Sequence, residues 1–155
     1  MSKVNPPFRA DHVGSLLRPP ALLTARAKAQ NGEISKAELR HREDEHIRDV
    51  VKKQEAIGLQ SITDGEFRRT FFHLDFLEQL AGVTVTGSIA ASSDAQEKVG
   101  FTPPRLSVTG KLRHVKNIQV DDFNFLKSQV SRAQGAIAKV TIPSPTMVHF
   151  RGGRQ

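Results

Sequence analysis

The strongest hydrophobic pattern in the chain is helical and begins near residue 35. Ser35 and Glu38 have the spacing of a capping box, which marks the start of a helix. Beyond them, apolar residues recur at helical spacing within a highly charged segment: Leu39, Ile47, Val50, Val51 and Ile57. Gly58 is a typical C-terminal stop. The pattern therefore predicts a helix from about Ser35 to Ile57 that buries one face.

Shorter apolar segments predict strands that alternate with helices. The expected strands are residues 8–17, 59–64 and 137–142. Residues 21–30 are helix-prone, and Asp121 or Asp122 is expected to cap a further helix. The inward residues of that helix are expected to be Leu126, Val130 and Ala133. Because strands and helices alternate, we expect the three strands to be adjacent and parallel.

A β-hairpin is expected to interrupt this alternation. Residues 82–86 and 105–112 alternate apolar and polar positions, and the segment between them is small, polar and proline-bearing. A complete (βα)8 barrel takes about 250 residues and eight strands. The chain has 155 residues. We therefore predict an α/β fold, an incomplete TIM-type barrel of about three βα units over residues 1–155, with a hairpin excursion at about 82–112.

Composition narrows the class of protein. The 37% hydrophobic and 25% charged content is ordinary for one globular domain, and no apolar run approaches the roughly 18 residues of a membrane span. The N-terminus lacks the apolar core of a secretory signal, so we expect a cytoplasmic protein without a membrane partner. With no cysteine, the chain has no disulfide and no thiolate ligand or nucleophile.

The net charge of +7 comes from the last third of the chain. Residues 101–155 hold nine lysines and arginines against only Asp121 and Asp122. A basic nucleic-acid-associated domain is therefore one alternative. The basic residues are interleaved with apolar ones, and no Trp or Tyr offers a stacking surface, so the pattern does not favour nucleic acid.

Candidate chemistry gathers where the predicted strands end, because βα-barrels place their working residues at the C-terminal ends of strands. Three segments qualify: His12-Val13-Gly14-Ser15, Asp64-Gly65-Glu66 and Pro143-Ser144-Pro145. Glycine lets a ligand approach the backbone, whose N–H groups can hold a carboxylate, and a carboxylate such as Glu66 can hold an ammonium group.

Each segment also has a purely structural interpretation. Gly14-Ser15 and Asp64-Gly65 are common in turns, and Pro143-Ser144-Pro145 can be a rigid loop. Glu66 can pair with Arg68 or Arg69 on the surface, and a lone histidine such as His12 is usually structural. The histidines show no zinc-ligand spacing, and the sequence has no Walker or dinucleotide-binding glycine motif.

The three segments, in this order, resemble the cobalamin-independent methionine synthase family. The similar stretches are residues 9–19, 62–69 and 140–147, and the resemblance runs over about residues 8–150. It concerns the N-terminal portion of the family's catalytic C-terminal barrel and of its single-barrel relatives. The first two stretches in tandem are the specific part of the match, and the third is less specific.

The resemblance implies a zinc-dependent S-methyltransferase of methionine biosynthesis. In this family a zinc-bound homocysteine thiolate takes a methyl group from a methyltetrahydrofolate, and single-barrel relatives use other thiols and alkyl donors. Gly14 and Ser15 match the loop that binds the amino-acid carboxylate, and Glu66 matches the glutamate that binds its ammonium group. His12, Asp64, Arg69 and Ser144 are secondary substrate-binding candidates.

The resemblance also implies what this chain lacks. The family's zinc ligands (His, Cys, Glu, Cys) and its folate-binding residues are expected in the C-terminal part, beyond residue 155. We therefore expect no catalytic residue and no bound zinc within this chain, which would be inactive alone. The alternatives are a non-catalytic binding module and a truncated remnant of the barrel. Open strand edges predict self-association or pairing with the missing half.

Overall fold

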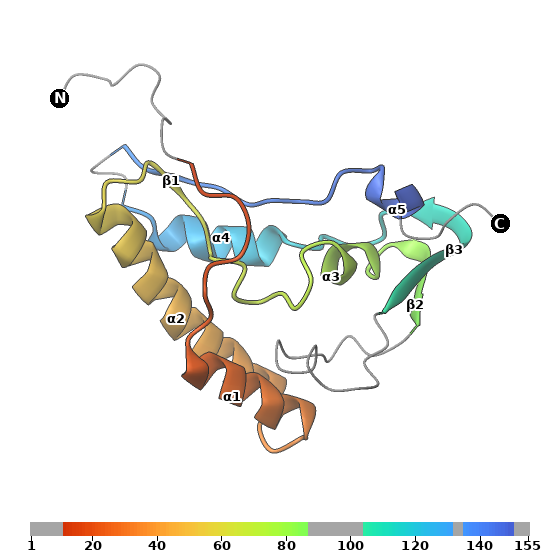
Figure 1. Ribbon diagram of the computed structural model, residues 1–155, viewed down its shortest axis with the longest axis horizontal. Coiled ribbons are helices and arrows are strands. Elements are labelled where there is room, and N and C mark those ends of the chain that lie inside the picture. The colour runs from red at the N-terminus through yellow and green to blue at the C-terminus, as the bar shows by residue number, and fades with distance from the viewer. Residues whose placement is uncertain (1–10, 87–103, 132–134, 151–155) are drawn as a thin grey trace. The chain divides into compact units, whose positions relative to one another are not determined.

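The computed structural model describes residues 11–86, 104–131 and 135–150, which divide into two compact units (Figure 1). The first unit comprises residues 1–68 and 121–141. The second comprises residues 69–120 and 142–155. Each unit has a hydrophobic core and is described by itself. No helix among the described residues is both long enough and apolar enough to cross a membrane.

The first unit begins with two helices joined by a short turn, and the second helix lies back against the first (Figure 1). Helix α1 spans Pro20–Gln30 and starts with a proline at a position where a missing N–H costs nothing. Helix α2 spans Lys36–Ala56, and the Ser35 hydroxyl accepts a hydrogen bond from the Glu38 amide at 3.1 Å. The predicted helix and its cap are confirmed, although the Glu38 carboxylate pairs with Arg42.

The buried face of α2 contains polar as well as apolar residues. Ile47 and Val51 are buried as predicted, and they share this face with Glu43 and Gln54. The prediction for Ile57 is wrong, because the helix ends at Ala56 and Ile57 is 76% exposed at the C-cap. The hydrophobic pattern therefore located the face but not the two buried polar side chains, which hold neighbouring segments in place.

Two of the three predicted strands form a parallel pair. Strand β1 spans Ser61–Ile62 and strand β4 spans Ile137–Ala138, with Ser61 opposite Ile137. Hydrogen bonds from Ile137 N to Gln60 O and from Lys139 N to Ile62 O, both 2.8 Å, extend the pairing. This parallel pair with packed helices agrees with the predicted α/β class.

The prediction of a strand over residues 8–17 is wrong for its described part. Residues 11–17 form no strand, and residues 8–10 lie outside the described residues. Gly14 has φ 98°, which interrupts an extended backbone because strands require negative φ. The segment still reaches the end of β1 through a hydrogen bond from Leu16 N to Gly65 O at 3.1 Å.

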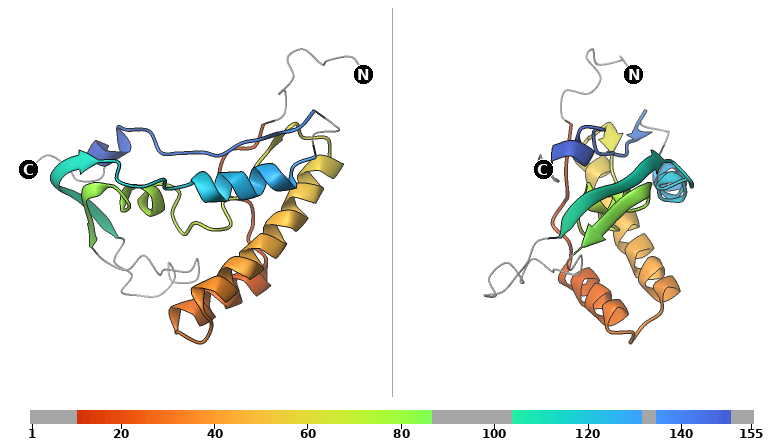
Figure 2. Two further views of the ribbon diagram at one scale, coloured as in Figure 1. Left: turned by 180° about the vertical axis from the view of Figure 1, so that it is seen from behind. Right: turned by 90° about the vertical axis from the view of Figure 1, so that its right-hand side faces the viewer.

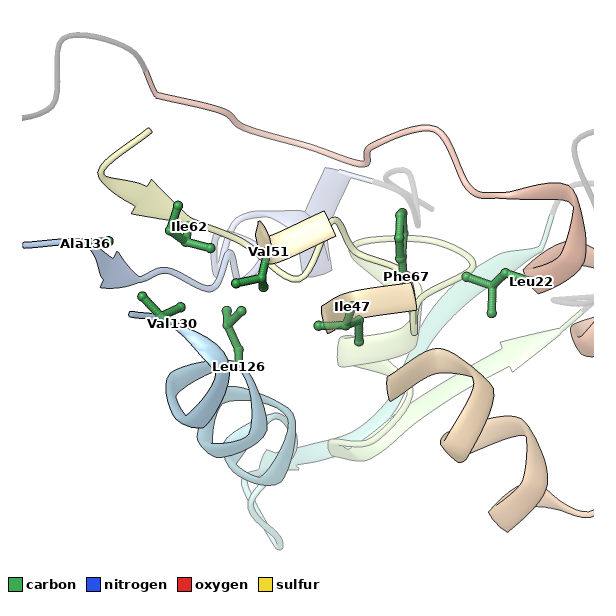
Figure 3. Close-up of a cluster of buried hydrophobic side chains, with 8 residues drawn as sticks. All are labelled: Leu22, Ile47, Val51, Ile62, Phe67, Leu126, Val130 and Ala136. Atoms are coloured by element: carbon green, nitrogen blue, oxygen red, sulfur yellow. The ribbon is translucent and has the colours of Figure 1, made fainter. Parts of the chain in front are cut away.

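Eight buried residues form the core of the first unit (Figure 3). Helix α4 spans Val120–Gln129. The core residues come from α1, α2, β1 and the turn after it, α4, and the segment between α4 and β4: Leu22, Ile47, Val51, Ile62, Phe67, Leu126, Val130 and Ala136. Burial of each large side chain contributes about 1.5–3 kcal/mol. Asp121 and Asp122 lie in the first turn of α4 rather than at its cap, and Ala133 lies outside the described residues.

The second unit contains the predicted hairpin (Figure 2). Strand β2 spans Ala81–Thr86, strand β3 spans Arg105–Arg113, and the two pair antiparallel. Two short helices complete the unit, α3 at Leu74–Leu77 and α5 at Met147–Phe150. Its core is a separate cluster of buried side chains: Leu74, Leu77, Leu106 and Val148. Residues 87–103, the predicted connection of the hairpin, lie outside the described residues.

Candidate functional site

The chain makes a sharp, buried turn directly after β1. Gly65 has φ 66°, and a Cβ there would lie 3.0 Å from Cε1 of Phe67, so any side chain would be crowded as well as strained. Glu66 has φ 57° and is the one non-glycine residue with positive φ among the described residues. This conformation costs a residue with a side chain about 1–2 kcal/mol. Surrounding contacts must therefore stabilise the turn.

Gln54 of α2 fixes the strand side of this turn. Its side-chain amide donates to Thr63 O at 2.8 Å, and its carbonyl oxygen accepts from Thr63 N at 3.0 Å. Thr63 Oγ1 in turn accepts a hydrogen bond from Gly65 N at 3.2 Å. All these groups are buried, so α2 satisfies backbone groups that neither β4 nor water reaches.

The turn holds the Glu66 side chain inside the first unit. Glu66 is 7% exposed, and its Oε1 accepts a hydrogen bond from the Thr141 hydroxyl at 3.0 Å. Its backbone N–H donates to Asp64 Oδ1 at 2.9 Å, and its carbonyl oxygen accepts from Arg18 Nη2 at 3.1 Å. Two of these contacts hold the Glu66 backbone and one reaches the carboxylate, so the buried carboxylate is an oriented acceptor for a cation or a hydrogen-bond donor.

The segment around Gly14 lies against the same turn. Ser15 is exposed, and its hydroxyl donates to Leu16 O at 3.0 Å and approaches Gly65 O at 3.4 Å. His12 Nε2 is 3.0 Å from Gly14 O, so the histidine supports the bend in its own segment. The structure thus brings Gly14, Ser15, Asp64 and Glu66 together within the first unit. Their roles as substrate ligands stay predictions.

An ion pair ties the Gly14 segment to β4. Lys139, which follows β4, donates from Nζ to Asp11 Oδ1 and to His12 O. This hydrogen bond from Lys139 lowers the pKa of the Asp11 carboxyl below its ordinary value. Residues 11–17 are therefore anchored at both ends, by Lys139 at one and by Gly65 at the other.

Arg69 and Ser144, two of the secondary candidates, belong to the second unit. Arg69 is buried there. Ser144 Oγ lies 2.9 Å from Thr146 Oγ1 and 3.4 Å from Thr146 N, a local turn just before α5. These local hydrogen bonds support the loop interpretation of Pro143-Ser144-Pro145, and the substrate role of Ser144 stays a prediction.

Thr141 was missing from the sequence-based candidates. The signal was present, because Thr141 lies in the segment that was predicted to continue the last strand. The regular strand instead ends at Ala138, three residues before the hydroxyl that contacts Glu66. A predicted strand that ended at Ala138 would have placed Thr141 just after a strand end, where the sequence analysis expects working residues.

Arg68 faces acidic side chains of α2 and α4 rather than the site. Its guanidinium pairs with Glu43 Oε2 at 3.2 Å, with Asp122 Oδ1 at 3.3 Å, and with Asp44. Arg26 reaches the other oxygen of Glu43 at 3.5 Å and donates to Phe67 O. The carboxylates of Glu43, Asp44 and Asp122 therefore hold, through Arg68 and Arg26, the residues that follow Glu66 in the turn.

Burial of Glu43 predicts a pH dependence of stability. Desolvation raises the pKa of its carboxyl, against the opposing effect of Arg26, Arg68 and Arg40. The folded chain then binds this proton more tightly than the unfolded chain, whose glutamate pKa is about 4.3. The contribution of Glu43 is greatest below that pH and is lost as the pH rises through the raised value.

We compare the free energy of unfolding of the wild type with that of Glu43→Gln. The wild-type value minus the variant value is expected to fall as the pH rises from about 4 to 6. Urea unfolding of both proteins at half-unit pH intervals measures this difference. Glu45→Gln, an exposed glutamate on the same helix, is the control and should show no such trend. A difference that rises over this range would contradict the assigned direction of the pKa change.

The described residues do not form a metal site. Within the part of the chain that the structure describes, no group of three or more His, Cys, Asp or Glu side chains could hold a metal ion. The Glu66 site offers the Glu66 carboxylate with a threonine hydroxyl, and the Asp64 carboxylate accepts from the backbone of the turn, a set without the nitrogen and sulfur ligands typical of zinc. The resemblance places the zinc ligands beyond residue 155, and that location stays a prediction.

Comparison with known proteins gives one consistent family. Residues 8–137 match the family model of the catalytic domain of cobalamin-independent synthase. A Bacillus subtilis protein, YxjH, is 43% identical over 93% of this chain and 37% of its own length. A methionine synthase from Sulfolobus acidocaldarius is 30% identical over 86% of this chain and 37% of its own length.

Solved structures agree with this result. A Listeria monocytogenes structure, described as a candidate vitamin-B12-independent methionine synthase, superposes with a TM-score of 0.73 and 43% identity. The match covers 94% of this chain and 39% of that one. The chain thus spans less than two fifths of the length of these relatives.

Proposed function

Because the chain belongs to the cobalamin-independent methionine synthase family, we propose that it supplies part of the amino-acid pocket of a zinc-dependent S-methyltransferase. The substrate class is homocysteine or a related thiol amino acid, and the methyl donor is a methyltetrahydrofolate. Glu66 holds the ammonium group of the amino acid. Gly14 and Ser15 lie at its carboxylate.

The observation that carries this proposal is the conformation of Glu66. A charged residue in a left-handed, buried turn is costly, and such strain persists at binding sites when neighbouring contacts enforce it. Glu66 follows the parallel strand β1, and the Ser15 segment contacts the backbone of the neighbouring Gly65. An ammonium group would gain a charge-assisted hydrogen bond there, the stronger kind of hydrogen bond.

The zinc ion is proposed to be held outside this chain. Zinc bound to the substrate sulfur would stabilise the thiolate at neutral pH. Its ligands are expected in the part of the relatives that lies beyond the match, since this chain has no cysteine and its described residues form no metal site. The residues of this chain bind and orient the amino acid.

A methyl-transfer assay tests the proposal. In a chimera, this chain replaces the matching part of the Listeria monocytogenes protein, which is 43% identical. We expect the chimera to form methionine from homocysteine and a methyltetrahydrofolate. Binding of homocysteine without methionine formation, while the unaltered Listeria protein is active, would favour the non-catalytic binding module instead.

A groove beside β4 is the proposed contact with the rest of the fold. It has a volume of about 200 Å³ and is lined by residues of α4, β4 and the ends of the segment between them: Phe123, Lys127, Val130, Ala136, Ile137 and Ala138. In the described residues, β4 pairs only with β1, so its other edge is open. We propose that the next βα unit of the longer relatives packs here, which would cover the groove and the open edge.

Complementation by a second polypeptide tests this contact. We expect the chain to co-purify with the part of the Listeria monocytogenes protein that follows the match, and Ile137→Lys to weaken this association at least tenfold. Ile137 is half-exposed in the groove, so the change buries a charge only when the partner is bound.

Ile57→Lys is the matched control, because Ile57 is exposed at the end of α2 and does not line the groove. Equal weakening by both substitutions would contradict the proposed contact. So would an unchanged association of Ile137→Lys.

A further inference from the structure

The Glu66 turn is held by contacts on both of its sides. On the strand side, Gln54 binds the backbone of Thr63. On the other side, Phe67 O accepts from Arg26, and Arg68 inserts its guanidinium among carboxylates of two helices. Glu66 lies between these two attachments, in a backbone conformation that its own side chain disfavours.

The cluster around Arg68 is balanced in charge. Three carboxylates face three guanidinium groups, those of Arg26, Arg40 and Arg68, and the acidic members are Glu43, Asp44 and Asp122. Arg68 contacts all three carboxylates, whereas Arg26 is paired with one and Arg40 with two. Arg68 is therefore the central cation of the cluster.

Arg68 is also the one of these cations that belongs to the turn segment. Its side chain is 5% exposed, and its guanidinium lies 5.1 Å from the centre of the Phe125 ring on α4. Arg68 is two residues from Glu66, and each residue of this stretch has only two rotatable backbone torsions, φ and ψ. A fixed guanidinium at residue 68 therefore restricts the directions that the backbone at residue 66 can take.

We infer that Arg68 is a positioning residue for Glu66: by bridging Glu43, Asp44 and Asp122, it holds the turn in the conformation that presents the Glu66 carboxylate. The planar guanidinium can contact several carboxylates at once in fixed directions, which an ammonium group cannot do. The relevance to substrate rests on the proposed function, but the effect on the turn does not.

Hydrogen exchange in the isolated chain separates positioning from general stability. The Glu66 amide reports the turn, because it donates to Asp64 Oδ1, and the Leu126 amide reports the core. In Arg68→Lys we expect exchange of the Glu66 amide to speed up at least tenfold relative to that of Leu126. Folded Arg68→Met should show a still larger ratio of the Glu66 exchange rate to the Leu126 exchange rate.

Arg40→Met is the matched control. Arg40 belongs to the same cluster and contacts two of its carboxylates, but its side chain is 42% exposed and it lies on α2, away from the turn. It should leave the ratio of the two exchange rates within about twofold of wild type. An equal acceleration of both amides in Arg68→Lys would overturn the inference, since that is the behaviour of a residue that only stabilises the fold.

The chimera distinguishes this inference from the proposed function. There, Arg68→Lys should weaken homocysteine binding three- to tenfold, and it should have no further effect when Glu66 is already Gln. If Glu66→Gln leaves homocysteine affinity unchanged, the proposed function fails, and the exchange ratio still decides whether Arg68 positions the turn.

Discussion

Gln54→Leu is expected to lower the free energy of unfolding by about 2–4 kcal/mol. The Gln54 side chain is 4% exposed and makes hydrogen bonds with both the N–H and the C=O of Thr63. Leucine fits the space but leaves both buried backbone groups without this partner, and each unsatisfied buried group costs about 1–3 kcal/mol. Domains of this size are stable by only about 5–15 kcal/mol, so the loss is a large fraction.

Urea unfolding measures this effect through a lower midpoint at an unchanged slope. Gln30→Leu is the control, because Gln30 is exposed at the end of α1 and should stay within about 0.5 kcal/mol of wild type. An unfolding free energy for Gln54→Leu within that same margin would show that water or a rearranged backbone satisfies Thr63 instead.

The burial of Gln54 and Glu43 on α2 could not be predicted from the hydrophobic pattern of the helix. The periodicity of α2 correctly predicted the helix, its cap and the burial of Ile47 and Val51. It could not predict that polar residues share the buried face, because their partners, Thr63 and Arg68, come from a segment whose path depends on tertiary contacts. The hairpin was easier to predict, since alternation and loop composition are local signals.

The strand ends were harder to predict for a related reason. Apolar runs over residues 8–17 and 137–142 have strand-like composition, but regular pairing extends only over Ile137–Ala138 in the second and is absent from the described part of the first. Pairing requires a neighbour with a matching register, which composition does not encode. The rule that polar groups gather at strand ends nevertheless selected Ser15 and Glu66, which lie around one turn.

Glu66→Gln is expected to weaken homocysteine binding in the chimera by about 1–3 kcal/mol, or roughly fivefold to 150-fold. Glutamine retains the shape of the side chain and can accept the Thr141 hydrogen bond, so the main change is the loss of charge. The zinc content should be unchanged, because Glu66 is not a proposed ligand. Glu45→Gln, on the exposed face of α2, should bind homocysteine like wild type.

Two results would contradict this role. Loss of zinc from Glu66→Gln would make Glu66 part of the metal site, and an unchanged homocysteine affinity would remove it from the amino-acid pocket. Calorimetric titration with homocysteine and metal analysis of the same preparations provide both readouts. Because the substitution conserves volume, the unfolding midpoint should confirm that the fold is intact.

The most direct test of the account asks whether Glu66 recognises the ammonium group itself. Homocysteine is compared with 4-mercaptobutanoic acid, which differs only in lacking the amino group, on the chimera and on its Glu66→Gln variant. We predict that the chimera binds homocysteine at least tenfold more tightly than the analogue, and that Glu66→Gln loses most of this preference while its affinity for the analogue changes little. A preference for homocysteine that persists undiminished in Glu66→Gln would contradict the account.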